Sequence, residues 1–266
     1  MTSLALYGCG RMGAAMLRGW IASGRAADAV VFDPDVANPV LAEAAQAGVR
    51  VNPDPLTLGP ARTIVLAVKP QTFAAGKLDP SALIGPSTLV LSIMAGLTLS
   101  RLAASTRAPV LVRAMPNTPA AIGRGVTTWV AGPGVDAERR AEVEALLAPL
   151  GSCIELGTEK ALDAATAVAG CGPAYVFLLT EAMAAAGEAE GLDPALALRL
   201  ARETIAGAGA LMESTTETPG ELRRAVTSPQ GVTAAAIDVL TDAGGMPALM
   251  RKAIARAVAR SRELGG

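Results

Sequence analysis

The chain has 266 residues, of which 51% are hydrophobic and 3% aromatic, and its formal net charge at pH 7 is −1. It contains no histidine, which excludes a Ser-His-Asp triad, a Cys-His pair and a histidine-bound zinc. The few aromatic residues and the near-neutral charge speak against binding to nucleic acid or to an anionic membrane surface.

The cysteines, Cys9, Cys153 and Cys171, are odd in number and far apart, so they predict neither a disulfide framework nor a metal site. No basic segment with a cleavage signal opens the sequence, and the longest uncharged stretch, residues 164–180, is interrupted by a Gly-Cys-Gly-Pro segment. We therefore expect a cytoplasmic protein with reduced thiols and without a membrane-spanning segment.

The first half of the chain alternates short apolar runs with segments of helical spacing, which is typical of a doubly wound parallel sheet. Predicted strands cover residues 4–7, 29–32, 48–51, 63–68, 88–93, 110–115, 125–131 and 153–156, and predicted helices cover 12–23, 38–47 and 136–148. The second helix is the best marked of these, because Asn38 can cap its start, Pro39 suits the first helical position and Gly48 suits its end.

A GCGRMG segment follows the first predicted strand and opens the first predicted helix. At such a junction Gly8 permits the tight turn, Gly10 lets the backbone approach a pyrophosphate, and Gly13 allows close packing of helix on strand. The helix start supplies free N–H groups for phosphate oxygens. The sequence therefore predicts a dinucleotide site of Rossmann type that comprises Gly8, Gly10, Arg11, Met12 and Gly13.

Asp33 ends the second predicted strand, where a carboxylate accepts hydrogen bonds from the adenosine ribose and repels a 2′-phosphate. Neither Lys nor Arg lies between Arg25 and Arg50, so the sequence favours NADH over NADPH. The alternative interpretation is that Asp33 caps the turn into Pro34.

Other cofactor residues are expected where later strands end, because ligands of open α/β sheets lie at the carboxyl ends of the strands. The expected residues at these tips are Ala67, Val68, Lys69, Pro70, Ala95, Gly96 and Asn117. A purely structural role in a rigid Met-Pro-Asn turn is equally compatible with Asn117.

From residue 158 onward the β-branched runs stop, and the sequence indicates helices only. Predicted helices cover residues 174–190, 194–213, a short stretch from 219, 233–241 and 247–264. The first of these is apolar on nearly all sides, with Glu181 as the charge in its middle, so we expect it to pack against a second subunit. The predicted architecture is an α/β Rossmann-like doubly wound domain, residues 1–157, followed by an all-α dimerisation domain, residues 158–266.

With these segments together, the chain resembles pyrroline-5-carboxylate reductases nearly end to end. The resemblance is carried by GCGRMG, AVKPQ, SIMAG, RAMPNTPAAIGRG, AGCGPAY and, most specifically, PGELRRAVTSPQGVTAAAIDVL. It implies the NAD(P)H-dependent reduction of L-Δ1-pyrroline-5-carboxylate to L-proline, the last step of proline biosynthesis. It also implies a homodimer with interleaved helical domains, which in some members assembles into a ring of dimers.

The resemblance also implies roles for the SPQGVT loop. Ser228 and the backbone of residues 231–233 would hold the substrate carboxylate, and the Thr233 hydroxyl would serve the imine nitrogen as a donor or proton relay. The expected substrate-binding residues are Ser228, Gln230, Gly231, Val232 and Thr233, with Thr233 as the catalytic one. Thr233 can also be the N-cap of the helix that follows.

The chain departs from the family pattern at two places. Gln230 stands where the family has a second glycine, and Asp33 favours NADH although members of the family commonly use NADPH. The AGCGPAY segment is expected to form a turn between two interface helices, with Cys171 as a small buried residue where the family often has serine.

Two other functions are compatible with parts of the sequence. β-Hydroxyacid dehydrogenases combine a similar first domain with helices, but they need a catalytic lysine in the helical half, where this chain has Lys160 and Lys252 outside any glycine-rich motif. A non-catalytic NAD(H)-sensing protein would explain the first half and leave the SPQGVT and GCGPAY segments without a role.

Overall fold

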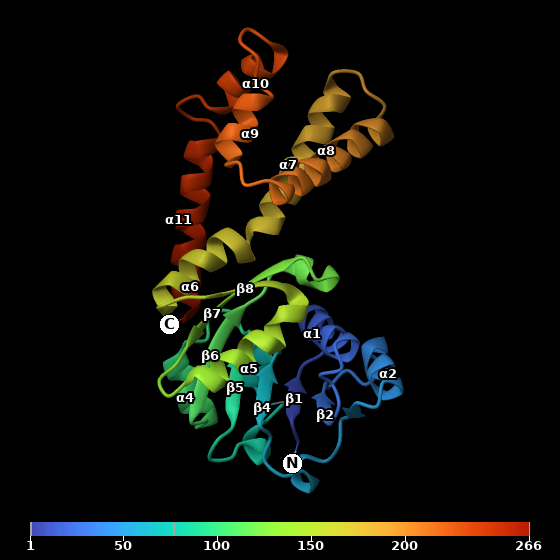
Figure 1. Cartoon of the computed structure of the whole chain (residues 1–266), viewed down its shortest axis with the longest axis vertical. Helices are drawn as coiled ribbons and strands as arrows, with labels where there is room; N and C mark the ends of the chain where they lie inside the picture. The colour runs from blue at the N-terminus through green and yellow to red at the C-terminus, as the bar shows by residue number, and fades with distance from the viewer. Residues whose placement is uncertain (1, 77, 266) are drawn as a thin grey trace. The chain divides into compact units, whose positions relative to one another are not determined.

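The computed structural model describes residues 2–76 and 78–265. The chain divides into two compact units (Figure 1). The first, here the sheet unit, runs to Cys171 and also includes the chain from Ala257 onward, whereas the second, the helical unit, is Gly172–Arg256. The helical unit is therefore inserted between two pieces of the sheet unit.

A sheet of eight strands, counted over the described residues, organises the sheet unit in the order β3-β2-β1-β4-β5-β6-β7-β8. The strands are β1 (Leu4–Tyr7), β2 (Ala29–Phe32), β3 (Arg50–Val51), β4 (Thr63–Leu66), β5 (Leu89–Ser92), β6 (Val110–Met115), β7 (Gly125–Ala131) and β8 (Gly151–Glu155). Strands β1, β2, β4 and β5 are buried along their whole length, as parallel strands covered on both faces must be. The predicted doubly wound architecture is confirmed.

One strand pair differs from the predicted parallel sheet, because β7 runs antiparallel to β6. The short helical turn Thr118–Ile122 is all that lies between these strands. A parallel return needs a crossover of a dozen or more residues, usually a full helix. The chain therefore folds straight back beside β6, and β8 then pairs parallel to β7.

Five helices connect the strands within the described part of the sheet unit: α1 (Arg11–Ala22), α2 (Pro39–Gln46), α3 (Pro70–Ala74), α4 (Leu99–Thr106) and α5 (Ala137–Leu147). The predicted cap of α2 is confirmed, because the Asn38 side chain accepts from the N–H of Val40 at 3.1 Å. Helices α1 and α5 share one core, in which the fully buried Trp20 donates its indole N–H to the carbonyl of Leu146 at 2.8 Å.

The predicted turn in the AGCGPAY segment is wrong. Helix α6 (Glu159–Ala165), a π-helical turn (Thr166–Gly170) and α7 (Gly172–Ala189) form one helical run instead. Pro173 near the start of α7 has no N–H for the carbonyl of Ala169, four residues earlier, and that carbonyl accepts from the Asn117 amide instead. Among the described residues, this run is the one helix whose length and apolar composition would suffice to cross a membrane.

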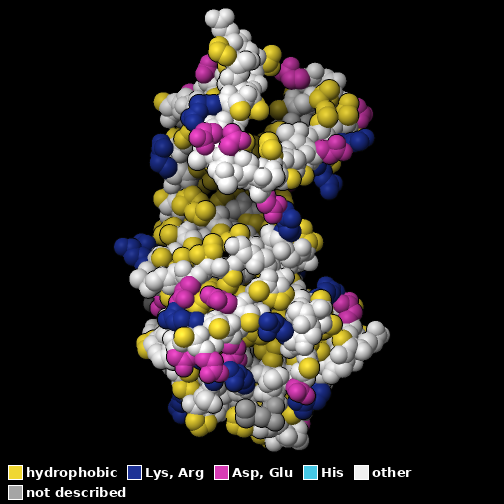
Figure 2. Space-filling view, in the orientation of Figure 1, with side chains coloured by type: hydrophobic (Ala, Val, Ile, Leu, Met, Phe, Trp, Pro, Cys, Tyr) yellow, Lys and Arg dark blue, Asp and Glu magenta, His cyan; other side chains and the backbone are white. Residues whose placement is uncertain are grey.

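The helical unit contains α7, α8 (Pro194–Ser214), α9 (Pro219–Ala225), α10 (Val232–Leu240) and most of α11 (Met246–Gly265). The predicted starts of α8 and α9 are confirmed: Asp193 caps α8, and Thr218 forms a capping box with Glu221. Among the described residues of this unit, the buried ones are Ala184, Ala197 and Ala201. Larger apolar side chains lie open on its surface (Figure 2).

Candidate active site

The turn after β1 can accommodate glycine only. Gly8 has φ +95°, and a Cβ there would lie 2.8 Å from the carbonyl oxygen of Ala67 and 2.7 Å from a methyl of Val68. A Cβ on Gly13 would lie 2.1 Å from the carbonyl oxygen of Gly8. Gly8 and Gly13 thus let strand β4, the turn and α1 approach closely, and the predicted residues Ala67 and Val68 are part of this packing.

Gly10 serves a different purpose, because a Cβ there would meet no atom within 4 Å. It is the N-cap of α1 and has no side chain to satisfy the N–H groups of the first turn. It lines a cavity of about 690 Å³ together with Arg11, Met12 and Asn38. The space beside Gly10 and the uncapped helix start suit the pyrophosphate of a dinucleotide.

Asp33 is buried and binds the glycine turn. One carboxylate oxygen accepts the N–H of Cys9, and the other accepts the N–H of Asp35 at 2.9 Å. The backbone of Asp33 is paired with the Asn52 amide at 2.9 and 3.0 Å. The capping role that the sequence left open is therefore present, and a carboxylate keeps acceptor capacity for a ribose hydroxyl beyond these two bonds.

The charges around this cavity are mixed. Its lining includes Arg11, Arg18 and Asp35. The guanidinium of Arg18 binds Glu43 in a bidentate pair at 2.7 and 2.8 Å, and this hydrogen bonding lowers the pKa of Glu43. Arg18 is thus already matched by a carboxylate, and Asp35 adds a negative charge near Asp33.

Cys9 lies inside the glycine turn and is not a nucleophile. Burial, with a smaller contribution from the Asp33 carboxylate, raises the pKa of the Cys9 thiol to about 11. Burial likewise raises the pKa of Cys153 to about 11. Both thiols are therefore protonated at neutral pH, and the reactive species of a cysteine is the thiolate.

A second cavity, of about 560 Å³, lies where β4 and β5 end. The predicted residues Pro70, Ala95 and Gly96 line it, together with Leu264 from the end of α11. Gly96 has φ +74°, and a Cβ there would lie 2.7 Å from the Cβ of Leu264. Lys69, the N-cap of α3, lines neither cavity.

The Asn117 amide is engaged at both ends. It donates to the carbonyl of Ala169 in the π-helical turn at 3.0 Å, and it accepts the N–H of Val126 on β7 at 2.9 Å. The residue is buried. These contacts support the structural role that the sequence left open, because they hold the end of β6 to β7 and to the π-helical turn.

The SPQGVT loop lies in the helical unit between α9 and α10. Gln230 has φ +56°, a left-handed conformation that glycine adopts without strain, so the chain keeps at Gln230 a backbone that suits the family's glycine. The N–H of Gly231 donates to the carbonyl of Ser228 at 3.1 Å, and a Cβ on Gly231 would lie 2.5 Å from the Ser228 hydroxyl. Ser228 and Gly231 are thus brought together in one tight turn.

The N-cap of α10 is Gly231, and Val232 is the first helical residue. The alternative N-cap role of Thr233 is therefore wrong. Thr233 is exposed, and its hydroxyl lies on the first turn of a helix that no side chain caps within the described residues. An uncapped helix start next to a free hydroxyl suits a carboxylate ligand with a neighbouring polar atom.

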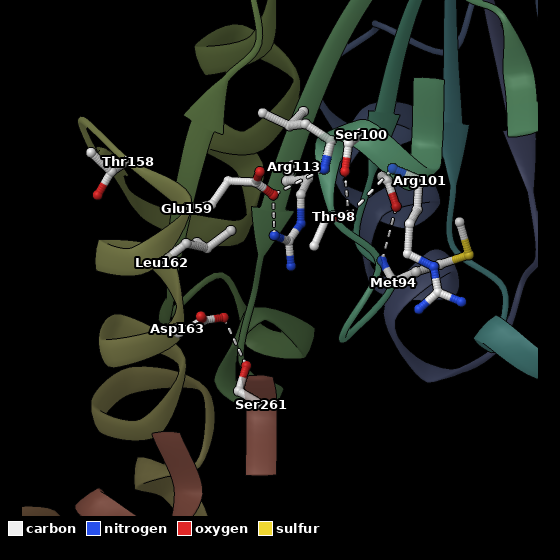
Figure 3. A network of polar contacts seen from close by, with 12 residues as sticks. Met94, Thr98, Ser100, Arg101, Arg113, Thr158, Glu159, Leu162, Asp163 and Ser261 are labelled. Atoms are coloured by element: carbon white, nitrogen blue, oxygen red, sulfur yellow. Dashed lines mark hydrogen bonds and ion pairs between the residues drawn. The ribbon is translucent and has the colours of Figure 1, made fainter. Parts of the chain in front are cut away.

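An ion pair between a buried arginine and a half-buried glutamate was not predicted from the sequence. Arg113 on β6 contacts Glu159 at the start of α6 (Figure 3). The one available signal was a charged residue in an otherwise apolar strand, which is rarely buried without a partner.

A glycine turn that suits a dinucleotide, together with a helical unit whose SPQGVT turn suits an anion, is typical of a nicotinamide-dependent oxidoreductase. A model of the family "NADP oxidoreductase coenzyme F420-dependent" matches residues 3–96, and a model for pyrroline-5-carboxylate reductase dimerisation matches residues 159–264. The chain belongs to the pyrroline-5-carboxylate reductase family.

Individual relatives agree with this assignment over most of the chain. A pyrroline-5-carboxylate reductase of Pseudomonas aeruginosa is 38% identical over 98% of this chain and 96% of its own length. The structure of a pyrroline-5-carboxylate reductase from Coxiella burnetii superposes with a TM-score of 0.89 at 31% identity and covers 100% of both chains. That from Plasmodium falciparum, with NADP bound, has a TM-score of 0.82 at 26% identity over 100% of this chain and 98% of its own.

Proposed function

We propose that the chain reduces L-Δ1-pyrroline-5-carboxylate to L-proline in proline biosynthesis. The observation that carries this function is the SPQGVT turn at the start of α10, which offers free N–H groups and two hydroxyls in a chain that also has a dinucleotide cradle. The names of the relatives support the same substrate.

The sheet unit holds the cofactor in this proposal. When bound, the reduced nicotinamide supplies the hydride. The backbone at Gly8, Gly10 and Gly13 and the start of α1 bind the pyrophosphate, with Arg11 and Met12 beside it. The residues assigned to the nicotinamide half are Ala67, Val68, Lys69, Pro70, Ala95, Gly96 and Asn117, of which Asn117 acts through the segments it holds.

The helical unit binds the substrate. Ser228 and the N–H groups of Val232 and Thr233 hold the carboxylate, while Gln230 and Gly231, whose N–H binds the carbonyl of Ser228, shape the turn. The Thr233 hydroxyl donates to the imine nitrogen and relays a proton from water. A threonine hydroxyl is too weak an acid to act alone, so its contribution is orientation of the proton donor, worth about 10²–10⁴ in rate.

The preferred cofactor is NADH. Asp33 and Asp35 place two carboxylates at the end of β2, where the 2′-phosphate of NADPH would need a cation, and Arg18 nearby is paired with Glu43. The Plasmodium falciparum relative, in contrast, has NADP bound. The ratio of kcat/KM for NADH and NADPH tests the preference, and a ratio in favour of NADPH would contradict it.

The helical domain, residues 158–266, forms a homodimer, and dimers assemble further into a ring. The apolar run Glu159–Ala189 belongs to this interface and not to a membrane, because Glu159 and Asp163 at its start make polar contacts with β6 and α11 within the sheet unit. We place the protein in the cytoplasm.

Neither alternative function is favoured by an observation, since Lys160 and Lys252 are exposed and lie outside a glycine-rich motif.

The decisive experiment measures oxidation of NADH and NADPH with pyrroline-5-carboxylate, and reduction of NAD and NADP with β-hydroxyacids. We expect turnover with the cyclic imine and none with the β-hydroxyacids. Turnover with hydroxyacids would favour the dehydrogenase, and tight NADH binding without any turnover would favour the sensor.

The Thr233→Val variant tests the proposed proton relay. We expect kcat to fall about 10²-fold or more while the Kd for NADH stays near that of the parent. Thr241→Val is the matched control at the other end of α10, because the Thr241 hydroxyl donates to the carbonyl of Ile237 at 2.7 Å within the helix. An unchanged kcat in Thr233→Val would remove this residue from the mechanism.

A further inference from the structure

One carboxylate joins three segments of the sheet unit. Glu159, the first residue of α6, accepts from a guanidinium nitrogen of Arg113 on β6 with the same oxygen that accepts the N–H of Leu99 at 2.9 Å (Figure 3). Leu99 is the first residue of α4. The Arg113 side chain is 6% exposed and that of Glu159 33%, so this pair is largely withdrawn from water.

Two of these segments carry residues of the proposed nicotinamide site. Leu99 follows the loop at residues 94–98, which contains Ala95 and Gly96. Arg113 lies on β6 just before the turn that contains Asn117. Glu159 itself lines neither cavity, so any influence on the cofactor is exerted through the segments it holds.

The same helix holds this loop by a second route. One helical turn after Glu159, Asp163 accepts from the hydroxyl of Ser261 on α11 at 2.9 Å (Figure 3). Farther along α11, Leu264 lies against Gly96. Glu159 therefore fixes the residue that directly follows the loop at 94–98, and the end of α11 links the loop itself to α6.

We propose that Glu159 is a positioning residue for the dinucleotide cofactor, which it serves by holding the loop at residues 94–98 and the end of β6 in their binding geometry before the cofactor arrives. The inference rests on the proposed cofactor site but not on the identity of the substrate. Without Glu159 the loop must be ordered at the expense of binding energy, so affinity falls while the bound complex keeps its reactivity.

The Glu159→Gln variant tests this role. It keeps the size of the side chain and an acceptor for Leu99, but removes the charge opposite Arg113. We expect the Kd for NADH, measured by calorimetric or fluorescence titration without substrate, to rise roughly tenfold while kcat changes less than about threefold. The matched control is Glu138→Gln, which removes another helix-start carboxylate paired with an arginine, Arg62, at 2.8 Å. Its Kd should equal that of the parent.

A second variant distinguishes a role of Glu159 in positioning the cofactor loop from a role in stability alone. Glu159→Gln leaves the buried Arg113 unpaired and lowers the Tm in either case, whereas the double change Arg113→Met with Glu159→Met removes both charges and should restore the Tm. A Kd that remains raised in the restored double variant supports positioning, and this variant carries the test if Glu159→Gln does not fold. A Kd within about twofold of the parent in the double variant overturns the proposal. A parent protein that binds neither NADH nor NADPH overturns the proposed function as well, and this outcome is visible before any variant is made.

Discussion

The two units bury their apolar side chains to different extents. In the sheet unit the two tryptophans, Trp20 and Trp129, are 0% exposed, whereas in the helical unit Phe177 is 58% and Val232 92% exposed. The described residues of the helical unit that are buried are all alanines. The sheet unit thus has a hydrophobic core of its own. The helical unit is equally rich in apolar side chains, but it leaves most of the large ones exposed.

The difference shows where the second unit must find its stability. Burying one large apolar side chain contributes about 1.5–3 kcal/mol, and a monomeric protein rarely leaves a large continuous apolar patch in water. Exposed residues on α7 and α8 include Val176, Phe177, Leu178, Leu196, Leu198 and Leu200. The match of residues 159–264 to a dimerisation family accounts for them, because a second subunit can cover such surfaces.

The largest expected effect comes from adding one methyl group to the glycine turn of the sheet unit. In Gly13→Ala the new Cβ would lie 2.1 Å from the carbonyl of Gly8, so the turn must move. We expect NADH binding to weaken about 100-fold or more, with a lowered Tm. Gly10→Ala is the matched variant, since its Cβ meets open space; it should keep the Tm and weaken binding about tenfold. Titration with NADH and thermal melts measure both effects. If Gly13→Ala bound NADH as the parent does, the close approach of Gly13 to the carbonyl of Gly8 would not matter for the cofactor site.

A smaller effect is expected from a charge on the surface of the helical unit. Phe177→Glu should shift the monomer–dimer equilibrium toward monomer by about 100-fold, because an unpaired carboxylate would be buried at the interface. Leu56→Glu is the control in the sheet unit, where Leu56 is 84% exposed. Sedimentation velocity distinguishes the two variants. If both remain dimeric, α7 does not form the interface and the contrast between the units has another cause.

The smallest expected effect concerns pH and the core of the sheet unit. Because burial raises the pKa of Cys9 to about 11 from an ordinary value of 9.0, the folded protein keeps its proton where the unfolded chain loses it. This contribution to stability is full below pH 9 and is lost as the pH rises to about 11. The parent should therefore lose about 1–3 kcal/mol more than Cys9→Ala between these limits in urea unfolding. Equal losses would show that the thiol is not protected.

Much of the sheet unit follows from its sequence. The bounds of β1, β2, β6 and β7 agree with the predicted runs, because buried strands are continuous apolar segments between turn residues. The direction of β7 was not predicted, since hydrophobic periodicity carries no information about strand direction. The short connection between Met115 and Gly125 contained that information.

The helical run through the AGCGPAY segment shows a limit of local signals. Two glycines and a proline indicate a turn, yet Pro173 fits the first turn of α7 and the π-helical turn accommodates Gly170. The carbonyl of Ala169 accepts a hydrogen bond from Asn117 in the turn after β6, and this contact helps fix the conformation. A contact between residues so far apart in sequence cannot be predicted from the local sequence of either segment.

The candidate site divides in the same way. Gly8, Gly10 and Gly13 were predicted because one continuous segment contains the strand end, the glycines and the helix start. Glu159 was missed because its partners, Arg113 and Leu99, come from two other elements. The second role of Asp33, as a cap of the turn into Pro34, was open in the sequence and is decided by the hydrogen bond that its carboxylate accepts from the N–H of Asp35. Its bond with the N–H of Cys9 was not predicted.

The return of α11 to the sheet unit affects how the chain must fold. During synthesis the loop at residues 94–98 emerges long before Ser261 and Leu264, which complete the surroundings of this loop. The dinucleotide site therefore cannot reach its final form until the helical unit has been made. A cell in which synthesis stops within α11 would accumulate chains with an intact glycine turn but an unsupported nicotinamide loop.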